Sequence, residues 1–142
     1  MTKLVLVRGL PGSGKSTYAE EITRVRPDDR YVWLEADMYF VDHKGNYNWH
    51  KNGIMHAHTW CQDTARIFLN NGKNVVVSNT FTTLKEMQPY IDHANLLGID
   101  IDVYRMTGDY GSVHDVPDEV IKKMSDRFEN NFGEVFVFDG VL

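Results

Sequence analysis

Residues 9–16 read Gly-Leu-Pro-Gly-Ser-Gly-Lys-Ser, which matches the spacing G-x-x-x-x-G-K-S/T of a phosphate-binding loop. An apolar, β-branched run over residues 3–7 precedes this motif, and residues 16–24 have the apolar spacing of a helix. Backbone N–H groups of such a loop and of the first helical turn converge on one point, where the helix dipole also favours an anion. The motif therefore predicts the order strand, phosphate loop and helix.

The candidate nucleotide contacts are consecutive residues of this loop: Gly12, Ser13, Gly14, Lys15, Ser16 and Thr17. The glycines let the backbone approach a phosphate without a Cβ in the way. Lys15 supplies a mobile positive charge, and the Ser16 hydroxyl can reach a magnesium ion. The pattern predicts ATP with Mg²⁺ as the ligand, and a glycine-rich turn without a ligand is the alternative.

Length and composition fit one soluble domain, because the chain has 142 residues, of which 42% are hydrophobic and 25% charged. The single cysteine, Cys61, excludes an internal disulfide and indicates a reducing compartment. No apolar run reaches the length of a signal-peptide core or a membrane span, so we expect a cytoplasmic protein without a membrane partner. The net charge of −5 argues against general affinity for nucleic acid, although a local basic groove is compatible with it.

Strand and helix patterns alternate along the chain. After the first strand, the predicted strands are 31–36, 73–79, 99–106 and 134–138, and the later helices are 54–69, 83–97 and 117 to about 130. This alternation predicts an α/β fold with a five-stranded, mainly parallel sheet and helices on both faces. In such sheets, ligands bind at the carboxyl ends of the strands.

Polar residues follow several of these strand ends. Asp37 comes just after the second strand, where a carboxylate can accept a proton from a hydroxyl that attacks the γ-phosphoryl group. The alternative role for Asp37 is the N-cap of a turn at 38–40. Asn79 and Thr80 follow the third strand and are candidate contacts to phosphate or substrate, while turn formation is an equally plausible role for Asn79.

Several segments, taken in order, resemble the polynucleotide-kinase-like branch of small P-loop kinases. They read GLPGSGKST, ADMYF with GNYNW, AHTWC, NTFT with EMQPY, and VHDVPDEVIKKMSDRFE, and the match runs from Lys3 to about Glu129. The resemblance implies a single-domain P-loop NTPase over residues 1–142, an ATP-dependent phosphotransferase with a lid over the nucleotide. It also implies a carboxylate after the second strand that activates a hydroxyl, which is Asp37 here. The lid and its following helix correspond to residues 111–127, within a lid region of about 108–127.

Two positions depart from this family. Met38 stands where relatives commonly carry a second acid, and Ser78 stands where they often carry an aspartate. Such an aspartate would usually hold magnesium through water. We therefore expect the metal site to depend on Ser16, on oxygens of ATP and on Asp37.

The lid must supply positive charge to the transferred group when it closes. Arg127 is the candidate, with Lys123 one helical turn earlier. The alternative for Arg127 is a surface interaction with Asp126, Glu129 or Asn130.

Histidines and aromatic residues are weaker candidates. His56 and His58 lie two residues apart and have no partners at zinc-ligand spacing, so we expect no zinc site. His58 is expected to pack or hydrogen-bond under the sheet, with substrate contact as the alternative, and a structural role is favoured for His114. The remaining candidates either stack on a ring of the acceptor or cover a small core, and they are Tyr39, Phe40, Tyr47 and Trp49.

Three functions follow from these observations. The first is a kinase that transfers the γ-phosphate of ATP to a polynucleotide 5′-hydroxyl, catalysed by Lys15, Asp37 and Arg127. The second keeps this chemistry with a nucleoside, a nucleotide or another small hydroxyl compound as acceptor. The third is an ATP-binding module or slow ATPase without a dedicated acceptor. A GTPase is disfavoured because the chain has no N-K-x-D stretch.

Overall fold

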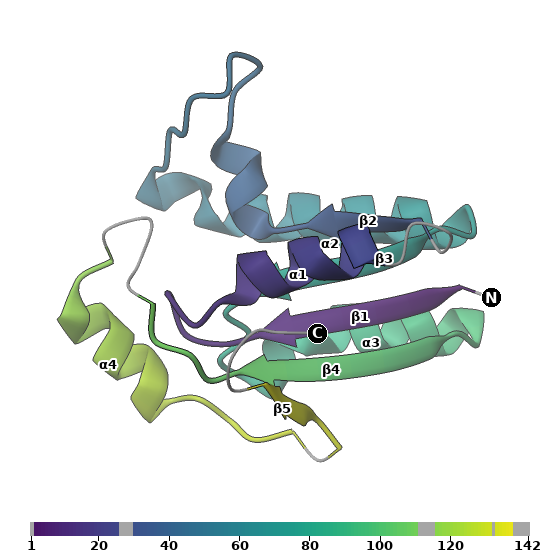
Figure 1. The fold of residues 1–142 in the computed structure, drawn as a ribbon. Coiled ribbons are helices and arrows are strands. Elements are labelled where there is room, and N and C mark those ends of the chain that lie inside the picture. The colour runs from purple at the N-terminus through teal and green to yellow at the C-terminus, as the bar shows by residue number, and fades with distance from the viewer. Residues whose placement is uncertain (1, 26–29, 111–115, 132, 138–142) are drawn as a thin grey trace.

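The computed structural model describes residues 2–25, 30–110, 116–131 and 133–137. Within these residues, five strands form one parallel sheet in the order β2-β3-β1-β4-β5 (Figure 1). The strands are β1 (Lys3–Arg8), β2 (Tyr31–Leu34), β3 (Asn74–Asn79), β4 (Asp100–Met106) and β5 (Val135–Val137). The predicted α/β class and parallel sheet are thus confirmed, and β1 with its phosphate loop lies at the centre.

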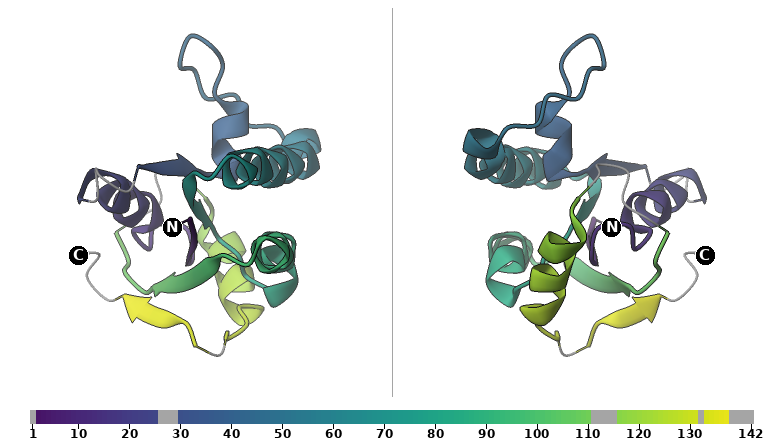
Figure 2. Two further views of the ribbon diagram at one scale, coloured as in Figure 1. Left: turned by 90° about the vertical axis from the view of Figure 1, so that its right-hand side faces the viewer. Right: turned by 90° about the vertical axis from the view of Figure 1, so that its left-hand side faces the viewer.

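Helices cover both faces of the sheet (Figure 2). Helix α1 (Lys15–Val25) packs on one face, against Val5 and Val7 of β1. Helices α2 (Ile54–Asn70) and α3 (Leu84–Leu97) pack on the other face, against Leu4 and Leu6. Because both faces are covered, β1 and β3 are apolar at successive positions rather than at alternate ones.

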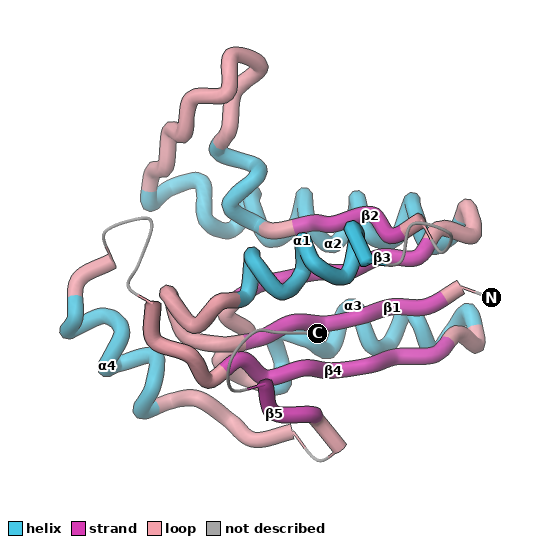
Figure 3. The backbone as a smooth tube through the Cα atoms, viewed as in Figure 1, coloured by secondary structure: helices cyan, strands magenta, loops and turns pink. Residues whose placement is uncertain are grey.

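The loops that leave the carboxyl ends of the strands gather at one edge of the sheet (Figure 3). Two short 3₁₀ helices, η1 (Ala36–Phe40) and η2 (Lys51–Gly53), flank a projecting segment between β2 and α2. Helix α4 (Asp118–Asp126) lies beyond the carboxyl ends of the strands. None of the helices within the described residues has the length and apolar composition needed to cross a membrane.

Two predicted boundaries differ from the structure by more than one residue. Helix α4 ends at Asp126, not near Asn130, because the chain then turns so that the Phe128 ring packs between the guanidinium groups of Arg8 and Arg105. Strand β2 ends at Leu34, so η1 begins at Ala36 with Glu35 as its N-cap residue. Asp37 therefore lies in the first turn of η1 and is not the N-cap of a turn at 38–40. Residues 111–115 of the predicted lid, including His114, lie outside the described residues.

Candidate active site

The phosphate loop connects β1 to α1 and has a backbone that only certain residues can adopt. Gly14 has a φ of +97°, in the region that favours glycine. A Cβ on Gly9 would lie 2.4 Å from Ser13 Oγ and 2.9 Å from the carbonyl oxygen of Met106. The Gly9 N–H donates to the Thr80 carbonyl at 3.2 Å, which joins the loop to the end of β3. The start of the loop is thus packed between the ends of β3 and β4.

Lys15 begins α1, and its ammonium group donates to the Leu10 carbonyl at 2.9 Å across the loop. Burial lowers the pKa of Lys15 to about 8, although the carboxylates of Glu35 and Asp37 act in the opposite direction. The two carboxylates therefore lie close enough to influence this ammonium group. A bound phosphate would add negative charge beside Lys15 and favour its protonated form.

Glu35 is the site residue that the sequence reasoning missed. Its Oε1 accepts a hydrogen bond from the Ser16 hydroxyl of the phosphate loop and a second from the Ser78 hydroxyl of β3 at 2.8 Å. Trp33 Nε1 donates to Ser78 Oγ at 2.9 Å. The rule that ligand contacts follow strand ends points to position 35 once β2 ends at Leu34, whereas the longer predicted strand left Glu35 inside the sheet.

Asp37 is partly buried in η1, and its Oδ1 accepts a hydrogen bond from the Tyr47 hydroxyl at 3.4 Å. Burial, followed by the charge of Asp37, raises the pKa of Tyr47 to about 12. Tyr47 therefore remains a proton donor to Asp37 at neutral pH. The structure thus brings Lys15, Glu35 and Asp37 together at the carboxyl edge of the sheet.

Asn79, the last residue of β3, contacts the segment that carries Glu35 and Asp37. Its Oδ1 accepts the Ala36 N–H at 2.8 Å, and its Nδ2 approaches Cys61 Sγ at 3.8 Å. Asn79 is buried, so its side chain positions the segment that carries Asp37. Thr80 is partly exposed and meets the phosphate loop through its backbone, as described above.

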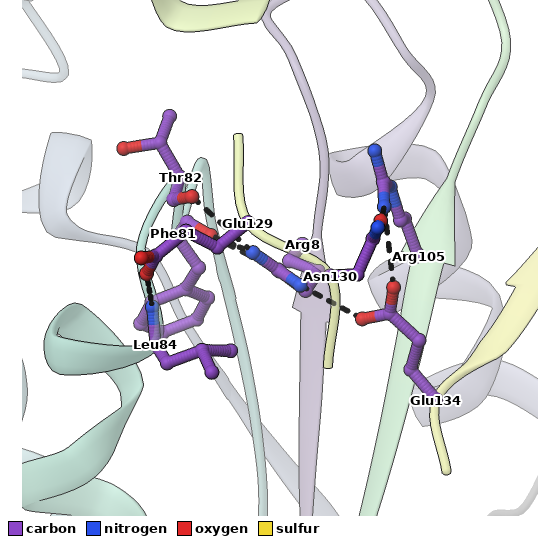
Figure 4. Close-up of polar contacts among 8 residues, drawn as sticks. All are labelled: Arg8, Phe81, Thr82, Leu84, Arg105, Glu129, Asn130 and Glu134. Atoms are coloured by element: carbon purple, nitrogen blue, oxygen red, sulfur yellow. Dashed lines mark hydrogen bonds and ion pairs between the residues drawn. The ribbon is translucent and has the colours of Figure 1, made fainter. Parts of the chain in front are cut away.

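Arg127 follows α4 and is exposed, and its Nε donates to Thr82 Oγ1 at 3.2 Å. The segment after α4 is fixed to the loop that follows β3, because the Glu129 N–H donates to the Thr82 carbonyl at 2.7 Å and Glu129 Oε1 accepts the Leu84 N–H at 2.7 Å (Figure 4). Arg127 is therefore held at the same edge of the sheet as the phosphate loop.

The histidine and aromatic candidates differ in how exposed their side chains are. His56 and His58 are exposed on α2, so the prediction that His58 packs under the sheet was wrong. The part of the chain that the structure describes contains no cluster of three or more His, Cys, Asp or Glu side chains placed to hold a metal. Phe40 is buried and contacts the rings of its more exposed neighbours, which are Tyr39, Tyr47 and Trp49.

A phosphate loop between a central parallel strand and the helix that follows it defines this chain as a P-loop protein. A family model described as an AAA domain matches residues 4–107, and the chain belongs to that family. Human NEDD4-binding protein 2 is 37% identical over 89 residues, which are 62% of this chain but only 5% of that protein's length. An uncharacterized protein of Pasteurella multocida is 27% identical over 135 residues, which cover 87% of this chain and 75% of that protein.

Solved structures share the fold, and kinases are among them. A gluconokinase from Sinorhizobium meliloti 1021 has a TM-score of 0.66 and 16% identity, over 96% of this chain and 82% of the gluconokinase chain. A chain of the Pnkp1/Rnl/Hen1 RNA repair complex has a TM-score of 0.60 and 24% identity, over 89% of this chain and 37% of that chain. At these identities, the likeness shows a common fold alone and does not identify a phosphate acceptor.

Proposed function

We propose that the chain is an ATP-dependent kinase whose acceptor is the 5′-hydroxyl of a polynucleotide. The observation that carries the proposal is the proximity of Lys15 and Asp37, since the charge of Asp37 acts on the Lys15 ammonium group beside the phosphate loop. Lys15 would bind the phosphates of ATP, and Asp37 would accept the proton of the attacking hydroxyl. The acceptor oxygen then bonds to the γ-phosphorus, the bond to the β–γ bridging oxygen breaks, and ADP leaves.

The residues beside the loop fit a magnesium ion. Mg²⁺ prefers oxygen ligands and is commonly bound by one or two carboxylates together with substrate phosphates. Ser16 offers a hydroxyl oxygen at the loop, and Glu35, which accepts a hydrogen bond from that hydroxyl, offers a carboxylate. When bound, the ion would neutralise charge on the phosphoryl oxygens. Arg127 is the proposed source of further positive charge on the transferred group.

Exposed aromatic side chains in the segment that follows Asp37 support a polynucleotide acceptor. Tyr39 is 41% exposed, Tyr47 is 38% exposed and Trp49 is 51% exposed. Aromatic faces stack on nucleobases with little dependence on sequence. Lys44 and Lys51 are also exposed in this segment, where they can meet backbone phosphates.

A small hydroxyl compound is the second candidate acceptor. The net charge of −5 opposes a long negatively charged strand, and one of the proteins that share the fold is a gluconokinase. Both acceptors use Lys15 and Asp37 in the same way, so the distinction depends on the surface formed by residues 39–51.

The test is transfer of labelled γ-phosphate from ATP and Mg²⁺ to 5′-hydroxyl DNA and RNA oligonucleotides, nucleosides, nucleotides and sugars. Asp37→Asn should lower the transfer rate about 10²- to 10⁴-fold without weakening ATP binding, because it removes the proton acceptor and leaves Lys15 in place. Lys15→Ala is the control for the phosphate loop. Label on oligonucleotides supports the proposal, and label only on a small compound favours the second acceptor. Release of free phosphate alone, or full activity of Asp37→Asn, would contradict the proposed mechanism.

A further inference from the structure

Glu35 links the phosphate loop to β3 through one oxygen atom. The direction of each hydrogen bond in this link is fixed, because the Trp33 indole can only donate. Ser78 Oγ accepts that N–H and therefore directs its own proton to Glu35 Oε1. Ser16 also directs its proton to Glu35 Oε1. Both hydroxyl protons thus point toward the carboxylate.

This arrangement prepares Ser16 to bind a cation. A hydroxyl has one proton and two lone pairs, and the proton of Ser16 is committed to Glu35. The lone pairs of Ser16 are then directed away from Glu35, and the carboxylate adds negative charge within hydrogen-bond distance of the same oxygen. Neutral hydroxyls do not cancel that charge, and the Lys15 ammonium group acts on it without forming an ion pair, because it donates to the Leu10 carbonyl. A divalent cation that bridges the loop and the phosphates of ATP would cancel it.

We propose that Glu35 is the acidic residue of the magnesium site, and that it takes the place of the aspartate that the resemblance leads one to expect at position 78. This inference rests on the proposed function, because the ion arrives with ATP. Together with Ser16 and the phosphate oxygens, Glu35 would hold Mg²⁺ directly or through one of the waters that the ion retains.

The structure separates the roles of the two carboxylates beside Lys15. Glu35 contacts the phosphate-loop hydroxyl, whereas Asp37 accepts a hydrogen bond from the Tyr47 hydroxyl in the projecting segment. Glu35 is therefore on the metal side of the site, and Asp37 is on the acceptor side. Exchange of one carboxylate for its amide should impair only one of these two roles.

The test measures ATP affinity by calorimetry, with Mg²⁺ and with EDTA, so that it does not depend on turnover. Magnesium should tighten ATP binding to the wild-type protein, and Glu35→Gln should lose about 10- to 100-fold of that gain. Without metal, Glu35→Gln should bind ATP at least as tightly as the wild type, because one negative charge beside the phosphates is gone. Asp37→Asn is the matched control and should keep the magnesium-dependent gain.

Other results of this calorimetric test would overturn either the inference alone or the kinase proposal as well. A normal magnesium-dependent gain in Glu35→Gln, or a loss in Asp37→Asn alone, overturns the inference and leaves the kinase proposal standing. Absence of ATP binding to the wild-type protein overturns both.

A second variant guards against misfolding of the first. Glu35→Ser combined with Ser78→Asp moves the carboxylate across the existing hydrogen bond from the end of β2 to β3. This double variant should recover most of the magnesium-dependent gain. A folded double variant without any gain would contradict the idea that the carboxylate is what the site requires.

Discussion

Two polar networks lie at the carboxyl ends of the strands, on opposite sides of β1. The serine–glutamate cluster (Ser16, Trp33, Glu35 and Ser78) joins α1, β2 and β3. The arginine network (Arg8, Arg105, Phe128 and Glu134) joins β1 and β4 to the segment between α4 and β5. Figure 4 shows its ion pairs between the two arginines and Glu134. Both contain a glutamate that accepts hydrogen bonds from two side chains, but the partners of the two glutamates carry different charges.

Glu134 is paired with cations inside the protein. Arg8 Nη1 lies 2.8 Å from one oxygen of Glu134, and Arg105 Nη1 lies 3.3 Å from the other. The side chain of Arg8 is 0% exposed and that of Glu134 is 2% exposed. Arg8 also donates to the Phe81 carbonyl from Nε at 3.0 Å and from Nη2 at 2.6 Å. This network is satisfied within the chain and holds the edge of the sheet together.

Glu35, in contrast, accepts hydrogen bonds from two neutral hydroxyls at a partly exposed position. Its charge is thus matched less completely than that of Glu134. A carboxylate engaged by guanidinium groups in the interior thus stabilises the fold, whereas one engaged by hydroxyls beside a phosphate loop is suited to a cationic ligand.

The largest expected effect comes from breaking the arginine network. Glu134→Ala leaves the guanidinium of Arg8 buried without its carboxylate, which should lower the free energy of unfolding by about 3–5 kcal/mol. Urea unfolding followed by circular dichroism measures this change. Because small domains have about 5–15 kcal/mol of stability in total, the midpoint should shift clearly.

Asp63→Ala is the matched control for this experiment. It removes an ion pair with Arg66 at 3.0 Å, in which the side chains are 60% and 40% exposed. Such exposed pairs contribute about 0.2–1 kcal/mol. Equal effects of Glu134→Ala and Asp63→Ala would mean that the arginine network does not support the fold as we describe.

The pH dependence of ATP affinity tests the electrostatics around the phosphate loop. Free Lys15, with its pKa lowered to about 8, loses its proton as the pH rises through that value, whereas bound phosphate favours the protonated form. Binding above pH 8 therefore requires proton uptake, and ATP affinity should fall by up to about tenfold per pH unit. Calorimetry between pH 6.5 and about 9.5 measures this.

Lys15→Arg provides the control, because arginine keeps its charge throughout this range. Its ATP affinity should not depend on pH above 8. An affinity of the wild-type protein that stays constant up to pH 9.5 would mean that Lys15 is protonated in both states, contrary to the lowered pKa.

The sequence was sufficient to predict what depends on local patterns. The phosphate-loop spacing predicted β1, the loop and α1, and the run Val75–Val77 predicted a strand buried on both faces. Glu35 was missed because the direction of its side chain depends on where β2 ends, and the predicted strand was two residues too long. The end of α4 was missed because it depends on Phe128 packing against Arg8, a contact between residues far apart in the chain. The roles assigned to Asp37 and Arg127 stay predictions.

The smallest expected effect sharpens the distinction between charge and hydrogen bonding within the serine–glutamate cluster. Ser78→Ala removes a neutral hydroxyl between Trp33 and Glu35 but leaves the carboxylate in place. It should lower the free energy of unfolding by about 1 kcal/mol, and Trp33→Phe, which removes the N–H donor of the Trp33–Ser78 hydrogen bond, should cost a similar amount. Because the charge of Glu35 remains, the tightening of ATP binding by magnesium should change by less than about fivefold in both variants, which corresponds to about 1 kcal/mol. If Ser78→Ala instead abolished that tightening as completely as Glu35→Gln, the orientation imposed by Ser78, rather than the charge of the carboxylate, would be what prepares Ser16 for the cation.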